Sequence, residues 1–198
     1  MPLLPLAMPR ADVRFNARFL PPADADALLR ELTDGIAWRQ EPIRLFGREV
    51  LQPRLIAWHG DAGAAYRYSG LQLQPAALTP TLHALRLRLQ QATGATYNSV
   101  LLNLYRHGQD SMGWHADDEP ELGPAPVIAS LSLGATRRFR FRRRPNASFE
   151  AAPVSLDLPH GSLLLMQGPT QHNWQHALPK TARPVGPRIN LTFRNIIS

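Results

Sequence analysis

Alternating apolar and polar residues mark the C-terminal end of the chain as a β-strand. In residues 188–194, Arg-Ile-Asn-Leu-Thr-Phe-Arg, every second residue is apolar. Successive side chains of a strand point to opposite faces, so the pattern predicts one face packed on a core and one polar face. The polar face carries Arg188, Asn190, Thr192 and Arg194.

Strand-like segments of this kind fill the second half of the sequence. Their spacing is regular and no long helix lies between them, which favours an antiparallel sandwich or jelly-roll over alternating strands and helices. The predicted strands span residues 98–106, 113–117, 126–133, 136–143, 153–158, 161–167 and 188–196.

Two helices are predicted before these strands. The first covers residues 24–33 and ends at Gly35. The second begins at Pro80, with Thr79 as its N-cap, and ends at Gly94. Leucines at helical spacing give each helix one apolar side, so both are expected to support the β-rich part of the chain.

A length of 198 residues suits one domain with a sizeable core. We expect residues 1–14 to be a loose leader. Residues 15–198 are predicted to form a single α+β, mainly β, domain, with its β core in residues 95–198 and short strands and turns from residue 38 to 70.

Composition narrows the possible classes of protein. The chain has no cysteine, which excludes disulfides, thiolate metal sites and cysteine nucleophiles. No apolar run reaches the ~18 residues that span a bilayer, and the N-terminus lacks a basic signal-peptide region. We therefore expect a cytoplasmic protein with no membrane partner. The formal net charge of +7 indicates a polyanionic partner or simply an arginine-rich proteome.

A metal site is predicted around His115 and Asp117, whose side chains share one side of a strand. With one more histidine they would form the set that binds non-haem Fe(II) and leaves positions open for a co-substrate and O₂. His176 is the best candidate for the third ligand, His172 is a competitor, and zinc is a competing metal. By itself, His-x-Asp more often marks a structural histidine.

A second polar face lies on the predicted strand 98–106, where Asn103 and Tyr105 share one side. An amide and a phenol directed into a core are costly unless they meet a polar partner. A small dianion would be such a partner, because the arginines of residues 188–194 can bind a carboxylate at each of its ends. The alternative is an outward-facing polar edge.

Residues 137–144 are rich in arginine. Phe139 and Phe141 are predicted to turn inward, which leaves a row of cations on the outer face. Such a row suits a phosphate backbone, and a solvated sheet edge is the alternative. The row consists of Arg138, Arg140 and Arg142.

Together these motifs resemble the AlkB family of 2-oxoglutarate- and iron-dependent dioxygenases, from about Phe46 to Asn195. The resemblance implies a double-stranded β-helix, a relative of the jelly-roll, with a nucleotide-recognition lid at about residues 38–75. The segments closest to the branch that repairs duplex DNA are residues 46–47, 60–63, 66–70 and 160–164.

This resemblance also implies the roles of the site residues. His115, Asp117 and His176 would hold Fe(II). Arg188 and Tyr105 would bind the distal carboxylate of 2-oxoglutarate. The whole pocket for 2-oxoglutarate would consist of Asn103, Tyr105, Arg188, Asn190, Thr192 and Arg194.

In the family, the damaged base leaves the stack and enters the lid. Tyr66 and Tyr68 would stack on it, Phe46 would fill the gap in the duplex, and Asp118 and Glu119 would read the base edge. Tyr66 and Tyr68 could instead be ordinary strand aromatics, and Phe46 a core residue. The full set of implied substrate contacts is Phe46, Arg54, Tyr66, Tyr68, Asp118, Glu119, Arg138, Arg140 and Arg142.

The activity that the resemblance implies is repair of N-alkylated bases in DNA, of the 1-methyladenine and 3-methylcytosine type. Fe(II), 2-oxoglutarate and O₂ would be used, and formaldehyde, succinate and CO₂ released. We expect a monomer that acts on duplex DNA, with single-stranded DNA as the alternative substrate. The same chemistry on RNA or protein would also fit these motifs, as would a non-catalytic, metal-containing module that binds nucleic acid.

Overall fold

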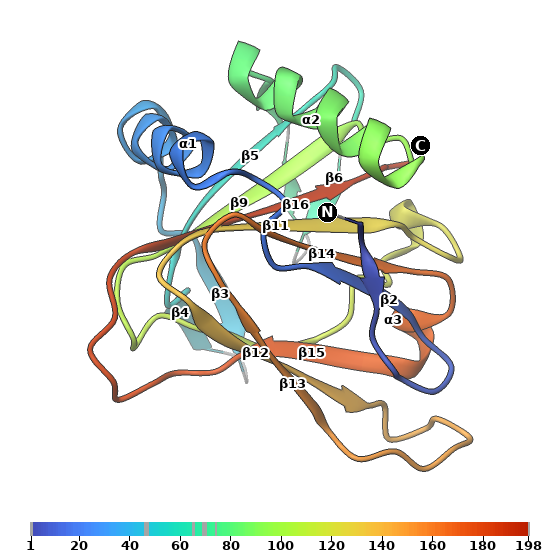
Figure 1. Cartoon of the computed structure of the whole chain (residues 1–198). Helices are drawn as coiled ribbons and strands as arrows, with labels where there is room; N and C mark the ends of the chain where they lie inside the picture. Colours follow the sequence, from blue (N-terminus) through green and yellow to red (C-terminus); the bar gives the residue numbers. More distant parts are fainter. Residues whose placement is uncertain (1, 46–47, 65, 69–70, 74, 198) are drawn as a thin grey trace.

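Two β-sheets face each other, and two helices cover the outer side of the larger sheet (Figure 1). The computed structural model describes residues 2–45, 48–64, 66–68, 71–73 and 75–197. The larger sheet has the strand order β1-β2-β14-β11-β16-β9-β5-β8. In that order its strands are Leu4–Pro5, Asp12–Asn16, Ser162–Gln167, Ile128–Gly134, Arg188–Arg194, Ser99–Tyr105, Leu55–Gly60 and Ala76–Ala77.

The smaller sheet has the order β10-β15-β12-β13, and all its strand pairs are antiparallel. The mainly β, jelly-roll fold class predicted from the sequence is therefore confirmed. The strands are Met112–His115, Trp174–Leu178, Arg137–Arg143 and Val154–Leu158, and they form the lower layer of Figure 1.

Strands β9 and β16 lie side by side in the larger sheet, with their polar residues on the same face. The antiparallel register sets Arg188 opposite Tyr105 and Asn190 opposite Asn103. Because side chains alternate along both strands, their other face is apolar and points toward the helices, whereas Leu101 of β9 shares the face of Asn103 and lines the cavity. Leu102 and Leu191 are fully buried in that layer. The predicted alternation of both strands is thus confirmed.

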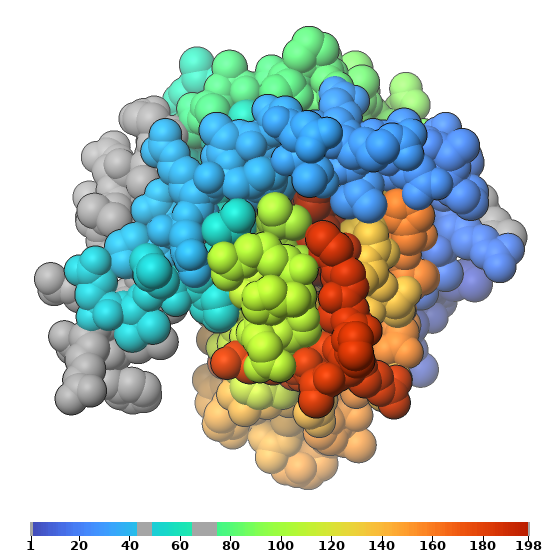
Figure 2. Space-filling view, turned by 90° about the vertical axis from the view of Figure 1, so that its left-hand side faces the viewer, coloured from blue at the N-terminus to red at the C-terminus, as the bar shows by residue number. Residues whose placement is uncertain are grey.

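The helices α1 (Pro22–Gly35) and α2 (Pro80–Thr93) cover this apolar face. The Thr79 side chain accepts a hydrogen bond from the backbone N–H of Leu82, and Gly94 ends α2 in the left-handed region at φ 72°, as predicted. Figure 2 shows α1 in blue above the red C-terminal strand. No helix in the described part of the chain is long and apolar enough to cross a membrane.

A second apolar core fills the space between the two sheets. Phe139 and Phe141 of β12 point into it and meet Met166 of β14. The predicted orientation of β12 is therefore confirmed, and its alternate arginines are exposed on the outer face. This core closes one end of the space between the sheets, and the polar faces of β9 and β16 line the other.

The expectation of a loose leader at residues 1–14 is wrong for the described residues. Strand β2 pairs with β14 along its whole length, and Val13 is buried. The indole Nε1–H of Trp174 donates to the carbonyl of Pro9 at 3.0 Å. The segment is ordered because β14 would otherwise leave one edge of backbone N–H and C=O groups unpaired.

The predicted lid at residues 38–75 is not one unit, and the β core does not begin at residue 95. Strand β5 belongs to the larger sheet, where it pairs with β9. Two short hairpins lie on either side of β5 in the sequence and form sheets of their own. They are β3 (Pro42–Leu45) with β4 (Arg48–Leu51), and β6 (Tyr66–Tyr68) with β7 (Leu71–Leu73).

Candidate active site

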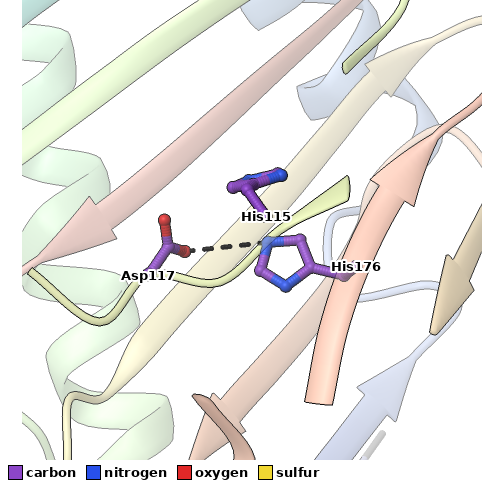
Figure 3. Close-up of side chains that lie close together, drawn as sticks. All are labelled: His115, Asp117 and His176. Atoms are coloured by element: carbon purple, nitrogen blue, oxygen red, sulfur yellow. Dashed lines mark ion pairs between the residues drawn. The ribbon is translucent and has the colours of Figure 1, made fainter. Parts of the chain in front are cut away.

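The three predicted metal ligands converge at one end of the space between the sheets (Figure 3). His115 on β10 lies opposite His176 on β15, and their ring centroids are 4.2 Å apart. Oδ2 of Asp117 lies 3.9 Å from Nε2 of His176. One ligand atom from each residue falls within 4.8 Å of the others, so the cluster can surround a single ion.

His172, the competing ligand, is not part of this cluster. It lies on the short helix α3 (Thr170–Asn173), and its Nε2 is 2.5 Å from the carbonyl oxygen of Pro124. His176 lies on β15, a strand that the sequence did not predict because its apolar residues do not alternate. The pairing with β10 therefore selects His176 over His172.

Burial and local charge put the inner ligands in their metal-binding protonation states. Burial, followed by the charge of His115, lowers the pKa of His176 to about 3, so its imidazole is neutral. Burial opposes ionisation of Asp117, but the nearby positive charge of Arg194 is the largest of the interactions that outweigh burial and hold the pKa of that carboxyl below its ordinary value. A neutral imidazole and a carboxylate are the forms that ligate a divalent metal.

Two side chains from distant parts of the sequence hold Asp117 in place. Nη2 of Arg194 donates to its Oδ1 at 2.6 Å. Its backbone N–H donates to Oε1 of Gln171 at 3.0 Å, and Gln171 is only 1% exposed. Gln171 was missed from the sequence, because a glutamine after a turn gives no local signal of a partner 54 residues away.

All six residues predicted to bind 2-oxoglutarate line the same cavity as the metal ligands. The cavity lies between the sheets, with Phe139 and Met166 among its apolar lining. The predicted convergence of the metal cluster with the polar faces of β9 and β16 is therefore seen in the structure. The six residues are Asn103, Tyr105, Arg188, Asn190, Thr192 and Arg194.

Arg188 is the most unusual of these residues because its charge is buried without a carboxylate partner among the described residues. Its side chain is 1% exposed, and burial lowers its pKa to about 10. Nη2 donates to Oγ of Ser132 at 2.9 Å, whereas Nε and Nη1 have no hydrogen-bond partner among the described residues. Its guanidinium carbon lies 5.2 Å from the ring centroid of Tyr105. A buried guanidinium with unused N–H donors can hold a carboxylate.

Asn190 and Thr192 shape the wall of the cavity. Nδ2 of Asn190 donates to Oγ of Ser130 at 2.8 Å and to the carbonyl of Leu131 at 3.0 Å. Oγ1 of Thr192 is 3.4 Å from Oδ1 of Asn190. Both donor hydrogens of the Asn190 amide are therefore used within the protein, which fixes β16 against β11 at the pocket.

Arg54 does not have the position expected of a residue that contacts DNA. It is 4% exposed, and its Nε donates to Oδ1 of Asn103 at 2.8 Å. Arg54 was predicted to help hold the lid or the backbone of the substrate, and that role stays a prediction; its guanidinium bonds to Gln52, Asn103 and the Ser111 carbonyl. Its neighbours place it behind the co-substrate pocket.

The predicted base-reading carboxylates differ in their surroundings. Asp118 is exposed, and its Oδ2 lies 2.6 Å from Nη1 of Arg144. Oε2 of Glu119 is buried and has no hydrogen-bond partner in the described part of the chain. Glu119 thus has the free acceptor that reading a base edge requires, whereas Asp118 already has a cationic partner. The predicted contacts of Phe46 and of the Tyr66 and Tyr68 side chains lie outside the described residues.

The arginine row of β12 is exposed as predicted, but two of its members have partners. Arg138 forms a two-point ion pair with Asp157, with N–O distances of 2.8 and 3.0 Å. Arg142 lies over the ring of Trp114 at 4.4 Å and donates to Oε1 of Gln175. The charge available to phosphates on this face is therefore smaller than the sequence alone predicts.

Fold and site together define the class of jelly-roll proteins that hold a metal with two histidines and one carboxylate. A family model described as the 2OG-Fe(II) oxygenase superfamily matches residues 12–194. Human alkB homolog 3, an alpha-ketoglutarate-dependent dioxygenase, is 42% identical over 184 residues, which is 90% of this chain and 64% of that protein. Mouse DNA oxidative demethylase ALKBH2 is 44% identical, over 88% of this chain and 76% of that protein.

The chain belongs to the AlkB family of the 2OG-Fe(II) oxygenase superfamily. It spans less than two thirds of the length of the human alkB homolog 3 that it matches. The solved structure of OsALKBH1 superposes with a TM-score of 0.64 at 19% identity, covering 96% of this chain and 100% of that chain, and supports the fold.

The cofactors that give the superfamily its name fit this cavity. His115, Asp117 and His176 supply the nitrogen and oxygen donors that Fe(II) accepts, and they leave room for further ligands. The unpaired Nε and Nη1 of Arg188 supply the charge and donors that a dicarboxylate needs at its far end.

Proposed function

We propose that this protein is an oxidative demethylase that repairs N-alkylated bases in DNA, of the 1-methyladenine and 3-methylcytosine type. One observation carries the proposal: a metal-ligand cluster and a buried, unpaired guanidinium line a single cavity. The first accounts for an iron site, and the second for a dicarboxylate co-substrate. The relatives named DNA oxidative demethylase support DNA as the substrate.

Bound Fe(II), with 2-oxoglutarate and O₂, supplies an oxidant that hydroxylates an unreactive C–H bond. One oxygen atom enters the methyl group and the other enters succinate, with loss of CO₂. The hydroxymethyl group then leaves the base nitrogen as formaldehyde, and the nitrogen lone pair is restored to the base.

The residues of this chain position the reactants and exclude water. Arg188 holds the co-substrate by its distal carboxylate, with Tyr105 beside the guanidinium. Arg194 holds Asp117 and lines the pocket at the metal end. Phe139 and Met166 give the cavity part of an apolar wall, and exclusion of water there strengthens each of these charged contacts.

We propose that residues near the metal ligands recognise the methylated base and the DNA backbone. The free Oε2 of Glu119 accepts a hydrogen bond from, or attracts, a cationic methylated base. The outer face of β12 carries Arg140 beside a groove that is also lined by Lys180 and Arg183. These cations suit a phosphate backbone, which they would contact without reading sequence. Duplex DNA is the substrate form that we propose, on the resemblance of residues 46–47 and 66–70.

The test is release of formaldehyde from defined oligonucleotides. The purified chain is incubated with Fe(II), 2-oxoglutarate and O₂, and with 1-methyladenine or 3-methylcytosine in double-stranded DNA, single-stranded DNA and RNA. Formaldehyde and the repaired base are measured together, and His115→Ala serves as the inactive control. Greater turnover of duplex DNA supports the whole proposal. Greater turnover of RNA would mean that RNA, and not DNA, is the substrate. If no oligonucleotide releases formaldehyde, the proposed activity is contradicted.

A further inference from the structure

Arg54 joins three separate segments from a buried position next to the cavity. Its Nε donates to Oδ1 of Asn103 on β9 at 2.8 Å, and its Nη2 to Oε1 of Gln52 at 2.5 Å. Its Nη1 lies 3.4 Å from the carbonyl oxygen of Ser111, which precedes β10. All three acceptors are neutral oxygens, so the residue serves as a multiple donor more than as an ion-pair partner.

The contact with Asn103 fixes which way its amide points. A guanidinium can only donate hydrogen bonds, so the Asn103 atom that meets Arg54 must be the amide oxygen. The amide NH₂ group is consequently turned away from Arg54. Asn103 also lines the cavity, directly opposite Asn190 in the register of β9 and β16. The residue therefore presents a donor to the cavity, which suits an anion.

The other two contacts make Arg54 a rigid support. Gln52 is 1% exposed and directly follows β4, and its backbone N–H donates to the carbonyl of Glu41 at the base of the β3–β4 hairpin. Ser111 donates its backbone N–H to the carbonyl of Pro53. Arg54 is thus held from the hairpin side and from the β10 side, so that its Nε stays aimed at Asn103.

We propose that Arg54 is a positioning residue for the co-substrate: it holds the Asn103 amide with its NH₂ group toward a carboxylate of 2-oxoglutarate. The inference rests on the proposed function, since it assigns the anion that this amide meets. It adds a role toward the co-substrate to the substrate role predicted for Arg54 from the sequence. Arg54 itself touches neither the metal ligands nor the co-substrate, and acts through Asn103.

The experiment measures binding without turnover. Protein loaded with Mn(II) in place of Fe(II) is titrated with 2-oxoglutarate by calorimetry, for wild type, Arg54→Met and Arg54→Lys. Both substitutions are expected to weaken 2-oxoglutarate about tenfold or more, because the amide is released and one hydrogen bond to a charged group is lost. Mn(II) affinity, measured separately, should stay within about twofold, since no metal ligand is altered. Arg86→Met, which removes a partly buried arginine paired with Asp61 on the helix side, is the matched control and should bind normally.

Asn103→Asp gives a second test that does not depend on removing Arg54. Its carboxylate can still accept from Arg54, so the protein should unfold at the wild-type temperature or above it. The cavity donor is replaced by a negative charge, so binding of 2-oxoglutarate should fall more than about tenfold.

Three results would decide against the inference or its basis. The inference is overturned if Arg54→Met and Arg54→Lys both fold and bind 2-oxoglutarate with wild-type affinity. It is also overturned if Asn103→Asp does so. Weaker binding of DNA with unchanged binding of 2-oxoglutarate in Arg54→Lys also overturns it, and restores a direct substrate role. If wild type itself does not bind 2-oxoglutarate, the proposed function fails first, and the inference fails with it.

Discussion

The guanidinium of Arg194 donates to the carboxylate of Asp117 across 2.6 Å, although the two residues lie 77 positions apart. Arg194 is the last residue of β16, whose polar face lines the co-substrate end of the cavity. Asp117 is a metal ligand that is 3% exposed. This contact ties the metal cluster to the strand that holds the co-substrate, so neither can move without affecting the other.

Replacing Arg194 by methionine should weaken metal binding even in the absence of 2-oxoglutarate. The substitution removes the charge that holds the pKa of Asp117 down, and it frees the carboxylate to rotate. We expect the affinity for Mn(II) to fall about tenfold or more, as measured by electron paramagnetic resonance titration. Arg14→Met, which removes an exposed ion pair with Asp12, should leave Mn(II) binding unchanged. Equal affinities in wild type and the Arg194 variant would contradict this role.

Gln171→Leu should also disturb the metal ligand Asp117, because Gln171 holds the backbone N–H of that residue. The N–H of Asp117 would lose its acceptor inside the protein, at a cost of about 1–3 kcal/mol in the free energy of unfolding. Urea denaturation of the metal-free protein measures that cost, and Mn(II) titration measures the accompanying loss of affinity. Gln109→Leu, at an exposed position, is the control. A Gln171 variant with normal stability and normal metal affinity would show that the contact is incidental.

Arg188 and Arg137 are both buried arginines, but their removal should have opposite effects on stability. Arg137→Met leaves three backbone carbonyls without their donor, so we expect a loss of about 3 kcal/mol or more. Arg188→Met removes a buried charge that has no carboxylate partner among the described residues. The free energy of unfolding of the metal-free variant should therefore equal that of wild type or exceed it by up to about 2 kcal/mol. Urea denaturation of both variants beside wild type makes the comparison.

The affinity of Arg188→Met for 2-oxoglutarate should fall about 100-fold or more, because the donors to its distal carboxylate are removed. Arg188→Lys should not restore binding, because an ammonium group lacks the planar fork that matches a carboxylate. Calorimetric titration of Mn(II)-loaded protein checks both. Near-normal binding in Arg188→Lys would mean that charge alone, without the fork, holds the co-substrate.

Asp110 gives a prediction about pH. It is 2% exposed and accepts hydrogen bonds from the backbone N–H, Nε and Nη2 of Arg106. Burial opposes its ionisation, but the hydrogen bonds from Arg106 outweigh burial and hold the pKa of Asp110 below 3.8. The stability that it contributes is therefore fully present above pH 3.8 and is lost as the pH falls through the lower, folded-state pKa.

Asp110→Asn should accordingly destabilise the protein by about 2 kcal/mol at neutral pH. The difference from wild type should shrink as the pH falls below 3.8 and vanish below the folded-state pKa. Urea denaturation across this range makes the comparison, with Asp34→Asn, at an exposed position of α1, as control. A difference that stays constant down to the lowest pH would show that the effect does not come from the charge.

Local patterns were enough to predict much of the fold and most of the cavity. The alternation of Arg188 to Arg194 fixed which residues face the pocket, because the two faces of a strand follow from backbone geometry alone. Thr79 and Gly94 marked the ends of α2, because a cap satisfies backbone groups within one turn. His115 and Asp117 could be predicted as a metal-ligand pair because they are two residues apart on one side of a strand.

Contacts between distant segments were decided only by the tertiary structure. Strand β15, the pairing of β2 with β14, and the choice of His176 over His172 depend on which backbone edges remain unpaired once the sheets form. Arg54 meets Asn103 across 49 residues, and Gln171 meets Asp117 across 54. The sequence by itself determined the local faces, the helix ends and the types of side chain in the cavity. Which of them meet was decided by sheet pairing, because a buried donor finds its acceptor by proximity in space and leaves no trace in the pattern along the chain.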